Sequence, residues 1–113
     1  MTAANRAGQA AAAALAVYQK GRQGLQDLVA SFPAGEQGHD PAAHLVLDET
    51  FASVIAAAEQ ARALALDYTA LTWRVGRAGR VKTLNESWDD AVGKLNDARA
   101  KARASAPAGT FPT

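Results

Sequence analysis

The stretch ETFASVIAAAEQARALALDYTALTWRV, residues 49–75, decides the fold because it is apolar along two sides at helical spacing. Its first stripe alternates steps of three and four residues, which is the spacing of a coiled-coil seam. This stripe holds Phe51, Val54, Ala58, Ala61, Ala65, Tyr68, Thr72 and Val75. A second stripe holds Ile55, Leu64, Leu66 and Leu71. A helix with two apolar sides is usually covered on both, so we expect residues 49–75 to form the central helix.

Similar seams predict one further helix before and one after this segment. The first spans about residues 2–32, with the seam Ala4, Ala7, Ala11, Ala14, Tyr18, Gly21, Leu25, Leu28 and Phe32. The third spans about residues 83–104, with the seam Leu84, Trp88, Ala91, Leu95, Ala98 and Ala102. The sequence thus predicts an all-α fold, an elongated three-helix bundle with Ala-rich seams. It forms a single domain over residues 1–104, followed by an extended C-terminal arm over residues 105–113.

Local signals predict where these helices begin. Residues 33–41 read PAGEQGHDP, a composition that ends a helix and forms a loop. Asp40 and Pro41 are a cap and first-turn pair, which predicts a short helical turn over 42–47. Asp48 is then expected to cap the central helix. The letters TLNE at the start of the third helix form a capping box, in which a threonine and a glutamate satisfy each other's backbone amides.

Two features of the chain have alternative interpretations. Residues 73–86, WRVGRAGRVKTLNE, contain two glycines and four cations, and we interpret them as a corner between the last two helices. The apolar residues around them keep a rough helical period, so these helices could instead run on as one bent rod. Gly8, Gly21 and Gly24 each cost about 1 kcal/mol against alanine in a helix. They indicate either a weakened first helix or a close crossing with another helix near Gly21 and Gly24.

The apolar residues of this chain are mostly small. Hydrophobic residues make up 49% of the 113 residues, but 29 residues are alanines. Alanine adds little area to a core, whereas burial of a leucine or phenylalanine contributes about 1.5–3 kcal/mol. Ordering each residue costs about 1–2 kcal/mol. We therefore expect a lean core that is stabilised by association with a partner or with copies of the same chain.

Charge is balanced overall but unevenly placed. The net charge is +1, so no global field favours nucleic acid or membrane. Residues 1–73 carry four Lys/Arg and seven Asp/Glu, whereas residues 74–113 carry eight and four. Helix dipoles account for most of this layout, since cations are favoured at helix C-termini and anions at N-termini. The alternative is a basic surface that binds phosphates, built from Arg74, Arg77, Arg80, Lys82, Arg99, Lys101 and Arg103.

The chain lacks the residue patterns that carry catalysis. It has no cysteine, no phosphate-binding loop and no G-x-S-x-G or H-E-x-x-H motif. Glu36 and His39 imitate part of a carboxylate–histidine metal motif, but the surrounding glycine and proline disfavour the helix it requires. We interpret His39 and His44 as solvated loop residues, and expect no enzyme activity, cofactor or metal. No apolar run reaches the roughly 20 residues that span a bilayer and no signal peptide is evident, so we expect a cytoplasmic or virion location and no membrane partner.

These features favour a non-catalytic structural or assembly protein. It would pack its helices and C-terminal arm against copies of itself or against other subunits, and a bacteriophage virion component (head, connector or tail) is one setting that fits. The candidate partner-binding residues are Ala4, Ala7, Ala11, Ala14, Trp73 and Phe111. The alternative function is a nucleic-acid-binding helical module that uses the basic residues named above.

Overall fold

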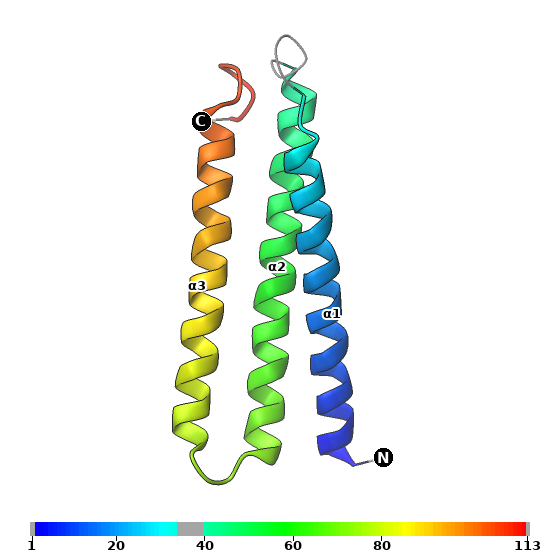
Figure 1. The fold of residues 1–113 in the computed structure, drawn as a ribbon, viewed down its shortest axis with the longest axis vertical. Helices are drawn as coiled ribbons and strands as arrows, with labels where there is room; N and C mark the ends of the chain where they lie inside the picture. Colours follow the sequence, from blue (N-terminus) through cyan, green and yellow to red (C-terminus); the bar gives the residue numbers. More distant parts are fainter. Residues whose placement is uncertain (1, 34–39, 113) are drawn as a thin grey trace.

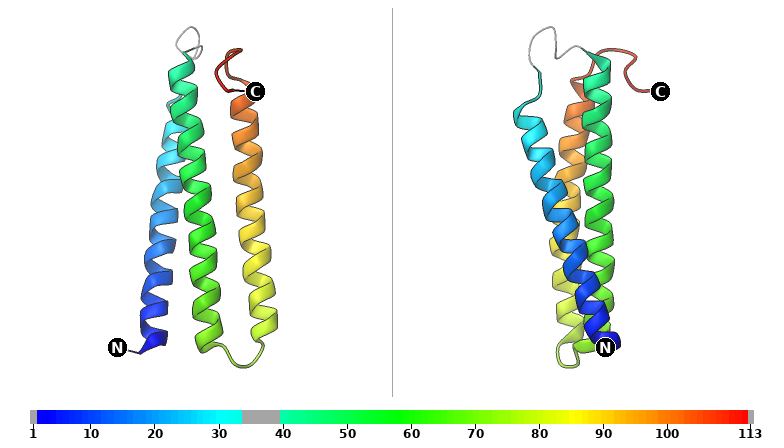
Figure 2. Two further views of the ribbon diagram at one scale, coloured as in Figure 1. Left: turned by 180° about the vertical axis from the view of Figure 1, so that it is seen from behind. Right: turned by 90° about the vertical axis from the view of Figure 1, so that its right-hand side faces the viewer.

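The computed structural model of this protein describes residues 2–33 and 40–112. Three long helices form an elongated bundle of 56 × 26 × 23 Å (Figure 1). Helix α1 spans Ala3–Ala30, α2 spans Pro41–Thr72 and α3 spans Arg77–Ala104. Helix α2 lies between the other two and packs against both, and α1 slants across the bundle (Figure 2, right). The fold of the described chain is therefore the predicted helical bundle, with α2 as its central helix.

Helix α1 is continuous, and its inward face is the predicted seam. Thr2 caps it, because the hydroxyl accepts a hydrogen bond of 3.0 Å from the amide of Asn5. Every seam residue from Ala4 to Leu28 is buried or half-buried, and nearly all positions between them are exposed. The alternation of three and four residues therefore identifies the buried face of this helix.

Helix α2 begins eight residues earlier than predicted, at Pro41. Asp40 is its N-cap, and the carboxylate accepts a hydrogen bond of 3.0 Å from the amide two residues later. The cap-and-proline pair thus starts a long helix rather than a short turn, and the prediction that Asp48 caps the central helix is wrong. The prediction of a solvated His44 is also wrong. His44 is buried within α2, and its ring meets that of Phe32 edge-on, with 4.8 Å between centroids.

Helix α3 begins at Arg77, six residues before the predicted capping box. Gly76 precedes it with a φ of 72°, a left-handed conformation that glycine adopts without steric cost. The break at residues 73–76 shows that α2 and α3 are two helices and that the bent-rod alternative is wrong. Thr83 lies inside α3, where its hydroxyl donates to the carbonyl oxygen of Gly79 at 3.0 Å. The capping-box prediction is therefore also wrong.

The core is thin and sits toward the end of the bundle where α1 ends and α2 begins. Its buried apolar members are Tyr18, Leu25, Leu47, Phe51, Val54, Ala58 and Ala61. Within the described residues, no large side chain is completely buried and α3 contributes no buried residue. Trp88 of α3 packs against the edge of this cluster, with 5.0 Å between its ring centroid and that of Tyr18.

Residues 105–112 continue the chain beyond α3 without helix. They form turns beside the end of α3, and do not project as a straight arm. Thr110 is buried, and its hydroxyl donates to the carbonyl oxygen of Pro107 at 2.7 Å. The residue before it is a glycine with a φ of 83°, which permits the reversal. The tail is thus held against the end of the bundle.

Candidate interaction surfaces

The α2–α3 corner, defined here as residues 71–80, is exposed throughout. Three of its apolar residues are exposed: Val75 keeps 90% of its surface accessible, Trp73 keeps 44%, and Leu71, which lines a depression with Ala7 of α1, keeps 55%. Exposed single hydrophobic residues are ordinary on protein surfaces, but contiguous apolar patches mark contacts with partners. The corner is therefore the first candidate surface, and it contains Trp73, one of the two aromatic residues predicted to contact a partner.

Four cations surround these exposed apolar residues. Arg77 donates from Nε to the carbonyl oxygen of Trp73, and the guanidinium of Arg80 lies 5.3 Å from the Trp73 ring centroid. Lys82 pairs with the glutamate one turn later at 3.8 Å. Arg74 makes no hydrogen bond or ion pair with the described part of the chain. The predicted corner is confirmed, but the prediction that helix dipoles account for its charges is wrong. Arg77 and Arg80 lie in the first turn of α3, where cations are unfavourable, and Arg74 follows the end of α2 as an exposed residue.

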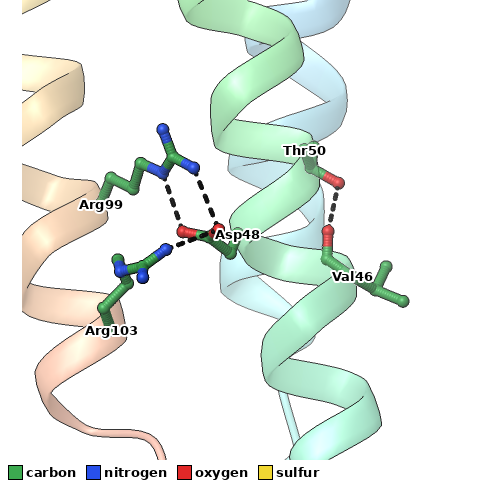
Figure 3. Close-up of polar contacts among 5 residues, drawn as sticks. All are labelled: Val46, Asp48, Thr50, Arg99 and Arg103. Atoms are coloured by element: carbon green, nitrogen blue, oxygen red, sulfur yellow. Dashed lines mark hydrogen bonds and ion pairs between the residues drawn. The ribbon is translucent and has the colours of Figure 1, made fainter. Parts of the chain in front are cut away.

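Asp48 joins α2 to α3 near the other end of the bundle (Figure 3). Its carboxylate accepts hydrogen bonds of 2.8 and 3.0 Å from Arg99 and one of 2.9 Å from Arg103. The Asp48 side chain is only 13% exposed. The hydrogen bonds from Arg99 lower the pKa of Asp48 below its ordinary value, although burial acts in the opposite direction. Sequence reasoning missed this cluster because its partners are 51 and 55 residues apart, so no local spacing links them.

The two basic clusters of the predicted phosphate-binding surface lie at opposite ends of α3. Arg77 and Arg103 are separated by about 40 Å along the helix axis. Arg99 and Arg103 are engaged by Asp48, and Lys101 is exposed beside them. The structure therefore brings residues 74–82 together at the corner but does not join them to the second cluster.

The alanine stripe of α1 lies on the face that packs against α2. Ala4, Ala7, Ala11 and Ala14 are all half-buried. Gly8 beside them approaches α2 so closely that a Cβ there would lie 3.1 Å from the Tyr68 ring. A Cβ on Gly21 would lie 3.4 Å from a Val54 methyl group, whereas one on Gly24 would meet nothing within 4 Å. The close crossing is thus present at Gly8 and Gly21, and the prediction for Gly24 is wrong.

An open apolar groove lies between α1 and α3, and we call it the α1–α3 groove. It is lined by Arg22, Leu25, Gln26, Val29, Ala30, Phe51, Leu95 and Ala98. Leu25 and Phe51 are core residues, so the inner wall of this groove is the core itself. Val29 on its rim is 51% exposed.

A second groove, the α1–α2 groove, lies between α1 and α2. It is lined by Gly21, Gly24, Leu28, Val46, Glu49, Thr50, Ser53 and Val54. Gly24 leaves it open because it contributes no side chain. Val46 is 54% exposed in this groove. Glu49 is the charged residue among those that line it.

Phe111, the other aromatic residue predicted to contact a partner, contacts its own chain. Its ring centroid lies 3.9 Å from the guanidinium of Arg103, in a cation–π geometry. Arg103 therefore binds Asp48 on one side and the tail on the other. This contact explains why residues 105–112 stay beside α3.

The candidate sites of this chain are thus a corner and two grooves. Among the described residues, no three His, Asp or Glu side chains are placed to hold a metal ion; Glu36 and His39 lie outside those residues. None of the three helices combines the length and the apolar character needed to cross a bilayer. Comparisons of the chain with protein-family models, with curated proteins and with solved structures found no match.

Proposed function

We propose that this protein is a non-catalytic helical assembly protein whose bundle is completed by another subunit. The observation that carries the proposal is the α1–α3 groove. In a closed bundle the first and third helices would pack together and cover the core between them. Here Tyr18 and Trp88 meet at mid-length, but farther along α1 the core residues Leu25 and Phe51 border an open groove.

The α1–α3 groove has the chemistry of a surface that receives a helix. Its walls are the apolar side chains of Val29, Leu95 and Ala98, and its rim carries Arg22 and Gln26. An amphipathic helix places residues spaced at i, i+3, i+4 and i+7 into such a groove. One helix added here would turn the three-helix arrangement into a four-helix bundle. The exposed apolar residue of this groove is Val29 of α1, and α3 borders the groove with Leu95 and Ala98.

Site-specific photo-crosslinking in the cell that makes the protein tests this proposal. A benzophenone side chain at Ala98, inside the groove, is expected to give a defined adduct with an amphipathic helix of another polypeptide, identified by mass spectrometry. The change Leu95→Arg is expected to remove that adduct. The same probe at Gly93, on the exposed side of α3, is the matched control. Absence of an adduct at Ala98, or equal adducts at Ala98 and Gly93, contradicts the proposal.

Nucleic-acid binding remains the second candidate function, and only the corner supports it. Arg74, Arg77 and Arg80 are exposed there beside Trp73, whose ring could stack on a base. Binding of a fluorescent single-stranded oligonucleotide, followed by anisotropy, is expected to weaken steeply as salt is raised if phosphates are contacted. It is also expected to disappear when Arg74 and Arg77 are changed to glutamate. An affinity for the oligonucleotide that changes neither with salt nor with these substitutions contradicts this function.

A further inference from the structure

We propose that the α2–α3 corner of one chain docks into the α1–α2 groove of a second copy, so that the chains join head to tail. The inference rests on the proposed assembly function and names one partner for it, a second copy of this chain. The contact leaves the α1–α3 groove free. It is carried by the charges, the exposed apolar residues and the shapes of the two surfaces.

Charge is segregated between these two surfaces. Residues 68–85, which contain the corner, carry four Lys/Arg and no Asp or Glu. Residues 23–61 carry six Asp/Glu and no Lys or Arg, and they include every residue of the α1–α2 groove except Gly21. Among the residues that line the groove, Glu49 is the charged one. A basic corner and a groove that carries a carboxylate are complementary between copies, and such complementarity steers association and fixes register.

Individual charges at both surfaces are available for a contact between chains. Arg74 makes no polar contact with the described part of its own chain, and Glu49 lies in the groove without a cation partner there. Asp27 is exposed one helical turn after Gly24, and among the described residues its carboxylate accepts a hydrogen bond only from the neutral Gln23. Asp48, by contrast, is already paired and contributes nothing. The groove therefore offers the carboxylate of Glu49 to the corner's guanidinium groups, and Asp27, one turn beyond Gly24 on α1, is a second exposed carboxylate outside its lining.

Apolar exposure indicates a protein partner for the corner. Val75 and Leu71 are exposed by 90% and 55%, and aliphatic side chains contribute nothing to phosphate binding. One face of the Trp73 ring is already occupied by Arg80. The α1–α2 groove supplies matching apolar contacts, including Val46, which is 54% exposed. Burial of these side chains on both partners favours association by about 25 cal/mol per Å² of apolar area.

The shapes of the two surfaces also correspond. The corner is the loop that projects beyond the ends of α2 and α3 at one end of the bundle (Figure 1), and Val75 is one of its residues. The α1–α2 groove is a shallow depression that is widely open to solvent. It is open because Gly21 and Gly24 have no side chains. A protruding apolar tip flanked by arginines can therefore enter a small-residue groove flanked by carboxylates.

This contact has a consequence for the form of the assembly. The corner and the groove are different surfaces, so each chain that docks by its corner leaves its groove free for the next chain. Such heterologous contacts produce rings when the rotation closes, and open filaments when it does not. The expected species at high protein concentration are therefore a closed dimer or ring where each corner finds a groove, and an open filament where the rotation does not close.

Reciprocal charge reversal tests this inference. The pair Arg74→Glu and Arg77→Glu makes the corner acidic, and the pair Asp27→Lys and Glu49→Lys makes the groove basic. In light scattering at low salt, the wild-type mass is expected to rise with concentration, and each double variant is expected to stay monomeric. An equimolar mixture of the two variants is expected to associate again, because each corner then meets a groove of opposite charge.

Filling the groove provides a second test that does not depend on charge. Gly24→Gln is expected to abolish association without unfolding the chain, since a Cβ there meets nothing within 4 Å. Gly93→Gln is the matched control, on an exposed glycine of α3 with equally open surroundings, and is expected to leave association unchanged.

Three results overturn the inference. They are a wild-type chain that is monomeric at every concentration, a variant mixture that fails to associate, and association that disappears when nuclease is added. The last result would assign the corner to nucleic acid. A monomeric wild-type chain that still gives the Ala98 adduct refutes head-to-tail joining and leaves the proposed assembly function in place.

Discussion

The two ends of this bundle are built differently, although the predicted seam of α1 runs through both. The predicted seam of the central helix is wrong at the corner, where Tyr68, Thr72 and Val75 are exposed. Where α1 ends and α2 begins, the bundle buries His44, Leu47 and Phe51, and Asp48 ties α2 to α3. Beyond Ala61, the remainder of α2 buries only Thr69, and the corner that follows is wholly exposed. Regular spacing thus aligns the helices at both ends, but only one end has the side chains that stabilise them.

Composition explains the difference. Helices α1 and α2 are antiparallel, so the alanine-rich first half of α1 faces the last part of α2. The bulky second half of α1, with Tyr18 and Leu25, faces the first part of α2. Surfaces that bind partners are commonly located in the less stable parts of a fold. We call the two ends the core end and the corner end, and the following predictions compare them.

Truncation of an aromatic side chain is expected to give the largest difference in lost stability between the two ends. Phe51→Ala at the core end is expected to lower the free energy of unfolding by about 3–5 kcal/mol, because it leaves a cavity in the core. Tyr68→Ala at the corner end is expected to lower it by less than about 1 kcal/mol, since that side chain is 39% exposed. Urea denaturation measures both values. Equal losses would show that the two ends contribute alike.

Loss of the Asp48 carboxylate is expected to have the next largest effect. Asp48→Asn removes a charged acceptor from Arg99 and Arg103, and is expected to cost about 1.5–3 kcal/mol. The matched control is Asp90→Asn, which removes an exposed pair with Lys94 and is expected to cost about 0.3–0.5 kcal/mol. Urea denaturation of both variants compares the two pairs. If the two variants lose the same amount of stability, Asp48 contributes no more to the fold than an exposed ion pair does.

The contribution of Asp48 is also expected to depend on pH. Arg99 lowers the pKa of Asp48 in the folded chain, so the stabilisation is complete above the unfolded-state pKa of about 4. It is lost as the pH falls through the lower folded-state pKa. The stability difference between wild type and Asp48→Asn should therefore be largest near neutral pH and shrink in acid. A difference that stays constant, or grows, at low pH contradicts this assignment.

Two glycine substitutions in α1 are expected to give the smallest effects, and gains in stability of different size. Gly24→Ala is expected to stabilise the chain by about 0.5–1 kcal/mol through helix propensity, since its Cβ enters open space. Gly8→Ala is expected to gain less, because its Cβ would lie 3.1 Å from the Tyr68 ring. Thermal unfolding at a concentration where the chain is monomeric compares them. An equal gain at both positions would show that Gly8 does not lie at a close crossing of α1 and α2.

The sequence predicts the pattern of contacts better than the ends of the helices. The steps of three and four residues identify the three helices, the central position of α2 and the buried face of α1, because burial follows helical periodicity directly. Local end signals are weaker. The signal at Asp40 is followed by enough helix-forming residues to continue without interruption, and Gly76 begins α3 before the capping box can act.

The contacts that sequence reasoning missed are those between distant residues. The Asp48 cluster joins residues more than 50 positions apart, and the burial of His44 depends on the ring of Phe32. For the candidate sites, the sequence correctly places the basic residues 74–82 in a corner. It does not reveal that Arg99 and Arg103 are both paired with Asp48, nor that Val75 is nearly fully exposed.

Hydrogen–deuterium exchange measured across a dilution series tests the central claim most directly. In dilute protein, amides of α2 near Phe51 are expected to exchange most slowly, and those at the corner end fastest. As concentration rises, protection is expected to increase together in residues 71–80 and in both walls of the α1–α2 groove, near Gly24 and Glu49, with little change on the exposed side of α3. Uniform exchange along the bundle, or corner amides whose exchange is indifferent to concentration, would contradict the account.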